Sequence, residues 1–97
     1  MALVIEWTLE AEKQLDDIIE YLESNWTERE IRNFFRKLEK ALEVISSKPL
    51  QQKRSERKEG AYEYQLSPQT TLFYSFDKTV ATILVLWLNR MNPEDLK

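Results

Sequence analysis

The order of apolar and polar residues along the 97-residue chain predicts a strand followed by two helices and three more strands. Residues 2–7 are a short, mostly apolar run, which predicts a buried strand. Thr8 then stands where a side-chain oxygen caps a helix N-terminus. From residue 9 to about residue 24, the apolar side chains recur at the spacing of one helical face: Leu15, Ile18, Ile19 and Leu22.

A second amphipathic helix follows after a short break. Thr27 and Glu30 stand at capping-box spacing, in which each side chain accepts a hydrogen bond from the other residue's backbone N–H. Pro49 prevents the helix from continuing beyond Ser46 and Ser47. Two such helices joined by a few residues predict an antiparallel helical hairpin. The apolar positions that keep the helical spacing are Ile31, Phe34, Phe35, Leu38, Leu42 and Ile45.

After residue 61 the apolar spacing changes from helical to alternating. Tyr62, Tyr64 and Leu66 alternate with Glu63 and Gln65, which predicts a strand with one buried face. The stretches that follow are nearly continuously apolar, and they predict two strands that are buried on both faces or nearly so. These strands are expected at residues 71–76 and 80–88, with a turn at residues 77–79.

These elements predict an α+β, two-layer fold in the order β-α-α-β-β-β. The last three strands form an antiparallel meander that packs against the helical hairpin, and the N-terminal strand lies at an edge. A chain of this length has room for one core, so we expect a single domain over residues 1–97.

The amino-acid composition excludes several classes of functional site. The chain has no Cys and no His, which excludes disulfides, Cys/His zinc sites, thiol nucleophiles and His-based catalysis. Its single glycine, Gly60, excludes Gly-rich phosphate loops. No apolar run approaches the roughly 20 residues that span a bilayer, and Glu6 interrupts any signal-peptide core. We therefore expect a cytoplasmic protein without a metal or cofactor.

Charge is unevenly distributed. Residues 1–47 carry 6 basic and 11 acidic side chains, whereas residues 48–59 carry 5 basic and 2 acidic ones, within a net charge of −3. The basic segment is either a target-binding patch or an ordinary solvated surface, and both interpretations stay open. Acidic residues along the first helix are expected to form a solvated face, because they flank no cleft: Asp16, Asp17, Glu20 and Glu23.

Four stretches together resemble the RelE/ParE superfamily of bacterial toxins, which belong to type II toxin–antitoxin and plasmid-stabilisation systems. They are WTLEAEKQLDDIIEYLESNW after the opening strand, then TLFYSF, ILVLWL and the closing NRMNPEDLK. The resemblance covers essentially the whole chain and rests on order, spacing and length more than on any single motif.

The resemblance also bears on mechanism. Superfamily members that cleave mRNA on the ribosome place basic residues on the sheet, where this chain has Glu63, Gln65 and Thr71. The closing MNPEDLK lacks the Tyr that some of these ribonucleases use. The chain therefore resembles the ParE-like branch, whose members bind DNA gyrase and have no catalytic residues of their own. A sequence pI near 5.0 departs from the basic character usual for such toxins.

The resemblance implies a toxin that binds a cellular target protein such as DNA gyrase and is neutralised by a cognate antitoxin. The alternatives are a ribosome-dependent mRNA endoribonuclease, acting through Lys58 and Arg90, and a degenerate, non-toxic relative. Trp87 is expected to remain partly exposed for a partner, whereas Trp7 and Trp26 are expected to pack in the core or between helix and loop. The candidate target-binding residues are Lys53, Arg54, Arg57, Lys58, Trp87, Asn89 and Arg90.

Overall fold

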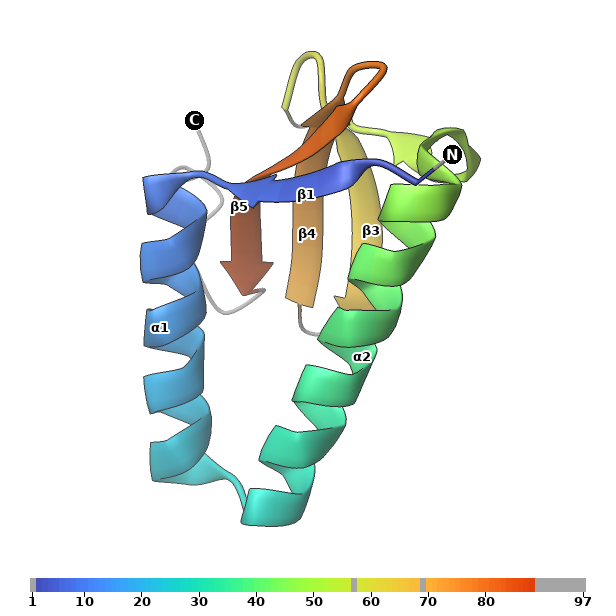
Figure 1. Ribbon diagram of the computed structural model, residues 1–97. Coiled ribbons are helices and arrows are strands. Elements are labelled where there is room, and N and C mark those ends of the chain that lie inside the picture. The colour runs from blue at the N-terminus through green and yellow to red at the C-terminus, as the bar shows by residue number, and fades with distance from the viewer. Residues whose placement is uncertain (1, 57, 69, 89–97) are drawn as a thin grey trace.

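The computed structural model describes residues 2–56, 58–68 and 70–88, and it has two layers (Figure 1). Two antiparallel helices, α1 (Leu9–Asn25) and α2 (Glu28–Ser47), lie on one face of a five-stranded sheet with the order β1-β5-β4-β3-β2. The predicted α+β architecture is confirmed. The remaining elements are β1 (Val4–Trp7), the 3-10 helix η1 (Pro49–Gln51), β2 (Lys53–Arg54), β3 (Tyr62–Ser67), β4 (Thr70–Phe76) and β5 (Val80–Leu88).

The sheet is mixed. Strand β1 lies at an edge, as predicted, and pairs in parallel with β5 from Val4 opposite Val80 to Trp7 opposite Ile83. Strands β3, β4 and β5 form the predicted antiparallel meander. The sequence did not predict β2, which lies within the basic segment at residues 48–59 and pairs with the start of β3. A strand of two polar residues shows no alternation of apolar and polar positions, so only its pairing with β3 identifies it.

Thr8 joins the helical layer to the sheet. Its Oγ1 accepts a hydrogen bond from the Ala11 N–H at 3.0 Å and caps α1. The same hydroxyl lies 3.2 Å from the carbonyl oxygen of Ile83 and 3.1 Å from that of Leu84. The register between β4 and β5 shifts at this point, because Phe73 pairs with Val85 and the next residue pairs with Ile83. Thr8 therefore begins α1 and holds the bulge in β5.

Strand β5 continues past the end of β1, and α1 contacts it there. The Oε1 of Gln14 accepts a hydrogen bond from the Leu86 N–H at 2.9 Å, where a neighbouring strand would otherwise supply the acceptor. At the other end of the helical layer, the Leu3 N–H donates to the Ser46 carbonyl at 2.9 Å. The Ser46 hydroxyl in turn donates to the Leu3 carbonyl at 2.6 Å.

The main core lies between the helices and the sheet. It joins the buried faces of α1 and α2 to side chains of β3, β4 and β5, and half-buried Trp7 and Trp26 pack against it, as expected. Tyr74 is fully buried there and donates its hydroxyl hydrogen bond to the Pro49 carbonyl at 2.5 Å. A second, smaller cluster contains no helix residue and lies on the opposite face of the sheet: Ala61, Phe73, Val85 and Trp87.

Candidate functional site

The basic segment contributes two cations at the sheet edge opposite β1. Lys53 and Arg54 form β2 and are exposed, with Lys53 opposite Glu63 and Arg54 opposite Tyr62. The guanidinium carbon of Arg54 lies 5.9 Å from the centre of the Tyr62 ring, which is within reach of a cation–π contact. Pairing and stacking therefore hold these two charges in place.

Hydrogen bonds hold the backbone after β2 against β3. The Ser55 hydroxyl donates to the Glu63 carboxylate at 2.8 Å and accepts from the Lys58 N–H at 2.9 Å. The Ser55 N–H donates to the Ala61 carbonyl, also at 2.8 Å. Lys58 is half-buried rather than fully exposed. Ser55 and the Lys58 backbone are thus tied to β3 as an extension of the sheet edge.

The face of the sheet away from the helices carries the positions at which ribonuclease relatives were expected to be basic. Cross-strand pairing places Gln65 opposite Thr71, and Thr71 opposite Trp87. Glu63 lies between Lys53 on β2 and Phe73 on β4. These positions carry a carboxylate, an amide and a hydroxyl, and the Thr71 side chain is buried. They carry no cation, and the nearest described cation in the strand register is Lys53.

Trp87 corrects one expectation. Its side chain is only 4% exposed, because it points into the cluster with Phe73 and Val85 on the face opposite the helices. Its position near the end of a strand favoured exposure, whereas packing against the other members of this cluster buries it. Three other candidates lie outside the described residues: Arg57, Asn89 and Arg90.

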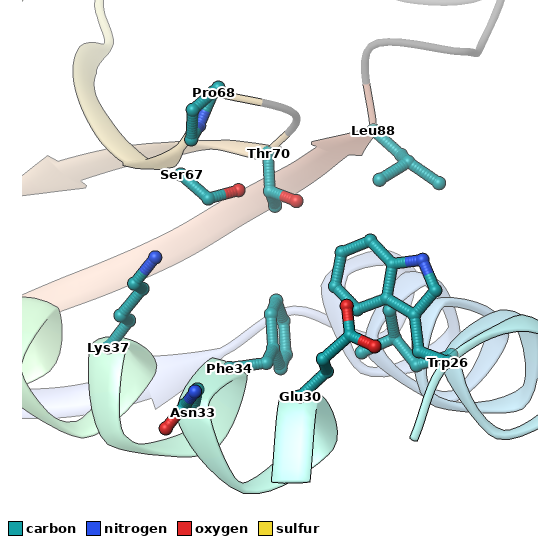
Figure 2. A pocket seen from close by; sticks show the side chains of 10 residues that line it. Trp26, Glu30, Asn33, Phe34, Lys37, Ser67, Pro68, Thr70 and Leu88 are labelled. Carbon is teal, nitrogen blue, oxygen red and sulfur yellow. The ribbon is translucent and has the colours of Figure 1, made fainter. Parts of the chain in front are cut away.

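A cleft of about 330 Å³ opens between α2 and the turn that joins β3 to β4 (Figure 2). Trp26, Phe34 and Leu88 point into it, while Glu30 and Lys37 stand at its α2 rim (Figure 2). The remaining lining residues are Leu22, Asn33, Ser67, Pro68 and Thr70. The sequence did not indicate this site, because its walls come from three segments far apart in the chain: residues within 22–37, residues within 67–70, and Leu88. Trp26, a large aromatic residue between two helices, was the available signal.

Burial changes the acid–base behaviour of one side chain in the main core. Desolvation, with a smaller contribution from nearby Tyr62, raises the pKa of the Tyr74 phenol far above its ordinary value. Tyr74 therefore stays protonated at neutral pH and acts as a hydrogen-bond donor to Pro49. In the part of the chain that the structure describes, no group of three or more acidic side chains could hold a metal ion. None of its helices has the length and apolar character required to span a membrane.

Solved structures with the same fold include chains of two toxin–antitoxin systems. A chain of the chromosomal ParDE system from P. aeruginosa superposes with a TM-score of 0.74 at 13% identity, covering 90% of this chain and 96% of that one. A chain of the E. coli DinJ–YafQ toxin–antitoxin complex gives 0.64 at 10% identity, with 93% and 96% coverage. The YoeB dimer from Staphylococcus aureus gives 0.61 at 16% identity, with 90% and 97% coverage.

The helical hairpin on a mixed sheet is thus a fold that this chain shares with these solved structures. Residues 5–93 match the family described as the ParE toxin of type II toxin–antitoxin system, parDE, and the chain belongs to this family. No curated protein sequence matches the chain. The resemblance predicted from the sequence is confirmed.

Proposed function

We propose that this type II toxin acts in the bacterial cytoplasm by binding a cellular protein such as DNA gyrase, without cutting RNA itself. The observation that carries the proposal is the absence of cations at Glu63, Gln65 and Thr71, within the described residues, on the face of the sheet away from the helices. Family membership supports the toxin class. The chemistry of these positions supports binding over catalysis.

Cleavage of an RNA phosphodiester develops negative charge on the phosphate, and fixed cations or N–H donors usually provide the largest stabilisation. Glu63 would repel that charge. Its carboxylate accepts a hydrogen bond from Ser55. The chain has no His to act as a general base near neutral pH. A toxin that acts only by binding needs neither a general base nor a cationic site for a phosphate.

Target contact is assigned to the basic edge of the sheet. Lys53 and Arg54 are exposed on β2, and Lys58 follows on the same extension. A cationic edge fits an acidic patch on a protein, and such charges chiefly accelerate association and select the partner. Arg57, Asn89 and Arg90 stay in the proposal on their sequence positions, and the buried Trp87 is not offered as a contact.

The test is controlled expression of the chain without an antitoxin, with two readouts. We expect growth arrest with DNA breaks and inhibition of supercoiling by purified gyrase, while transcripts on ribosomes remain intact. The double variant Lys53→Glu, Arg54→Glu should relieve inhibition with an unchanged far-UV spectrum. Lys78→Glu, at an exposed cation in the turn after β4, is the matched control and should remain toxic. Codon-specific mRNA cuts, or no effect on growth, would contradict the proposal.

We further propose that the cognate antitoxin places an amphipathic segment in the cleft beside α2. The walls formed by Trp26, Phe34 and Leu88 suit apolar side chains, and the Glu30 and Lys37 rim suits a polar outer face. Neutralisation of this kind requires no contact with the basic edge.

This part of the proposal is tested by filling the cleft. Asn33→Trp puts a bulky ring at the cleft wall, and it should weaken antitoxin binding about tenfold or more while leaving toxicity intact. Glu39→Trp, at an exposed α2 position that does not line the cleft, is the control. Calorimetric titration with the antitoxin measures both variants, and equal affinities would refute the assignment.

A further inference from the structure

The two helices carry opposite charge on their exposed surfaces. Helix α1 has six acidic side chains and one lysine, whereas α2 has five basic and four acidic side chains. The buried positions of both helices face the sheet, so the charged positions form the outer surface of the helical layer. That surface is therefore acidic along α1, and it carries a row of basic side chains along the middle of α2.

Helical spacing gathers these charges into two lines. On α1, four exposed acids recur at intervals of four, four and three residues and lie along one face. On α2, four exposed cations recur at intervals of three, four and four residues. We call Glu12, Asp16, Glu20 and Glu23 the acidic stripe, and Arg29, Arg32, Arg36 and Lys40 the basic stripe.

The stripes match in height along the hairpin. The helices run antiparallel from a short connection at Trp26 and Thr27, so residues about equally far from it lie level with one another (Figure 1). By this measure Glu23 is level with Arg29, and Glu20 with Arg32. The same holds for the pairs Asp16 with Arg36 and Glu12 with Lys40, so each acid has a cation at its own height on the other helix.

These charges do not pair across the hairpin. Among residues 2–56, 58–68 and 70–88, the only ion pair joins Arg32 Nη2 to Glu28 Oε1 at 3.0 Å, and both residues lie on α2. The helices diverge from their connection (Figure 1), and all eight stripe residues are exposed. The complementary lines are therefore available to a partner.

We propose that the partner is a second copy of this chain, with the two helical hairpins packed face to face. A two-fold axis that lies between the two copies and runs parallel to the bisector of the hairpin places α1 of each copy along α2 of the other. This follows because rotation about that axis exchanges the α1 side and the α2 side of the hairpin. Each acidic stripe then meets a basic stripe at matching heights, twice in the dimer. The facing helices also run antiparallel, so their dipoles are favourably arranged.

The size of this surface predicts a weak dimer. Helices of 17 and 20 residues at about 1.5 Å per residue and about 10 Å across present a face on the order of 500 Å². A stable interface typically buries about 800 Å² on each partner. Phe35, 37% exposed beside the basic stripe, adds apolar area. Association through charge should therefore depend strongly on salt.

The experiment is sedimentation of the purified full chain, which needs neither a target nor an antitoxin. We expect a monomer–dimer equilibrium at about 0.1 M salt, where screening extends over about 10 Å, and monomer at about 1 M, where it falls to about 3 Å. The variant Asp16→Lys, Glu23→Lys and the variant Arg29→Glu, Arg36→Glu should each raise the dimer dissociation constant about tenfold or more.

Rescue distinguishes this contact from a general loss of folding. An equimolar mixture of the two variants should form a heterodimer, because both contacts then join opposite charges. The chain carrying all four substitutions should form a homodimer again. Far-UV spectra should match the native protein throughout, because all four positions are exposed. A native chain that stays monomeric at low salt, variants that dimerise unchanged, or a mixture that fails to associate would each overturn the proposal.

Discussion

The two faces of the sheet are built differently. The face under the helices packs buried side chains from α1, α2 and three strands into one core. The opposite face has a small cluster around Phe73, Val85 and Trp87, beside the polar positions Glu63 and Gln65. Stability is therefore concentrated under the helices, whereas the opposite face buries fewer side chains. Five predictions test this difference.

The largest effect is expected from Leu72→Ala in the helix-covered core. Leu72 is fully buried between the layers. The truncation should lower the free energy of unfolding by about 2–5 kcal/mol, from lost burial and the cavity that remains. Urea denaturation followed by far-UV circular dichroism measures it. A loss below that range would mean that the helices contribute less to this core than their packing indicates.

Thr8→Ala tests how α1 is attached to the shared strand β5. The Thr8 hydroxyl caps α1 and contacts two carbonyls at the bulge, so its loss should cost about 2 kcal/mol. Thr27→Ala is the matched control, since the Thr27 hydroxyl hydrogen-bonds within the capping box of α2, and it should cost about 1 kcal/mol. Equal losses from the two variants, by thermal melting, would contradict the bridging role.

Val85→Ala probes the opposite face. Val85 is 3% exposed in the smaller cluster, and removing its two methyl groups should cost about 1.5 kcal/mol. Because no helix residue belongs to that cluster, the rate of amide hydrogen exchange in α1 and α2 should change only as much as the change in global stability requires. Selective loss of protection in the helices would show that the two faces are coupled more tightly than their separate clusters indicate.

Tyr74→Phe removes a hydrogen bond to Pro49 within the core and should cost about 1 kcal/mol at neutral pH. The raised pKa of Tyr74 also predicts a pH dependence. The folded protein keeps the phenol proton, whereas the unfolded chain releases it above about pH 10. The contribution of the Tyr74 phenol to the free energy of unfolding is fully present below about pH 10 and falls as the pH rises further. The Phe variant should lose that part of the alkaline slope in denaturation curves.

The smallest effect on stability is expected at the basic edge. Lys53 is exposed in a two-residue strand, so Lys53→Ala should change the free energy of unfolding by less than about 0.5 kcal/mol. If this edge binds the target, the same variant should still reduce inhibition of growth. A large stability loss would mean that β2 supports the sheet rather than presenting charges from it.

The sequence alone predicted the order of elements, because helical and alternating apolar spacing are local properties of the chain. Thr8, Thr27 and Glu30 marked the helix starts, and the apolar run at residues 80–88 indicated an interior strand. It also predicted the family and the non-basic positions on the sheet, since both depend on residue identity. These features need no knowledge of which segments meet in space.

Only the tertiary structure decided what depends on distant segments coming together. It buried Trp87, whose strand position had favoured exposure, and it created β2 by pairing two polar residues with β3. It formed the cleft around Trp26 from three separated segments and set the two charged stripes at equal heights. The burial of a side chain, the pairing of two strands and the relative height of residues on two helices all depend on residues far apart in the chain. A local sequence pattern therefore does not predict them.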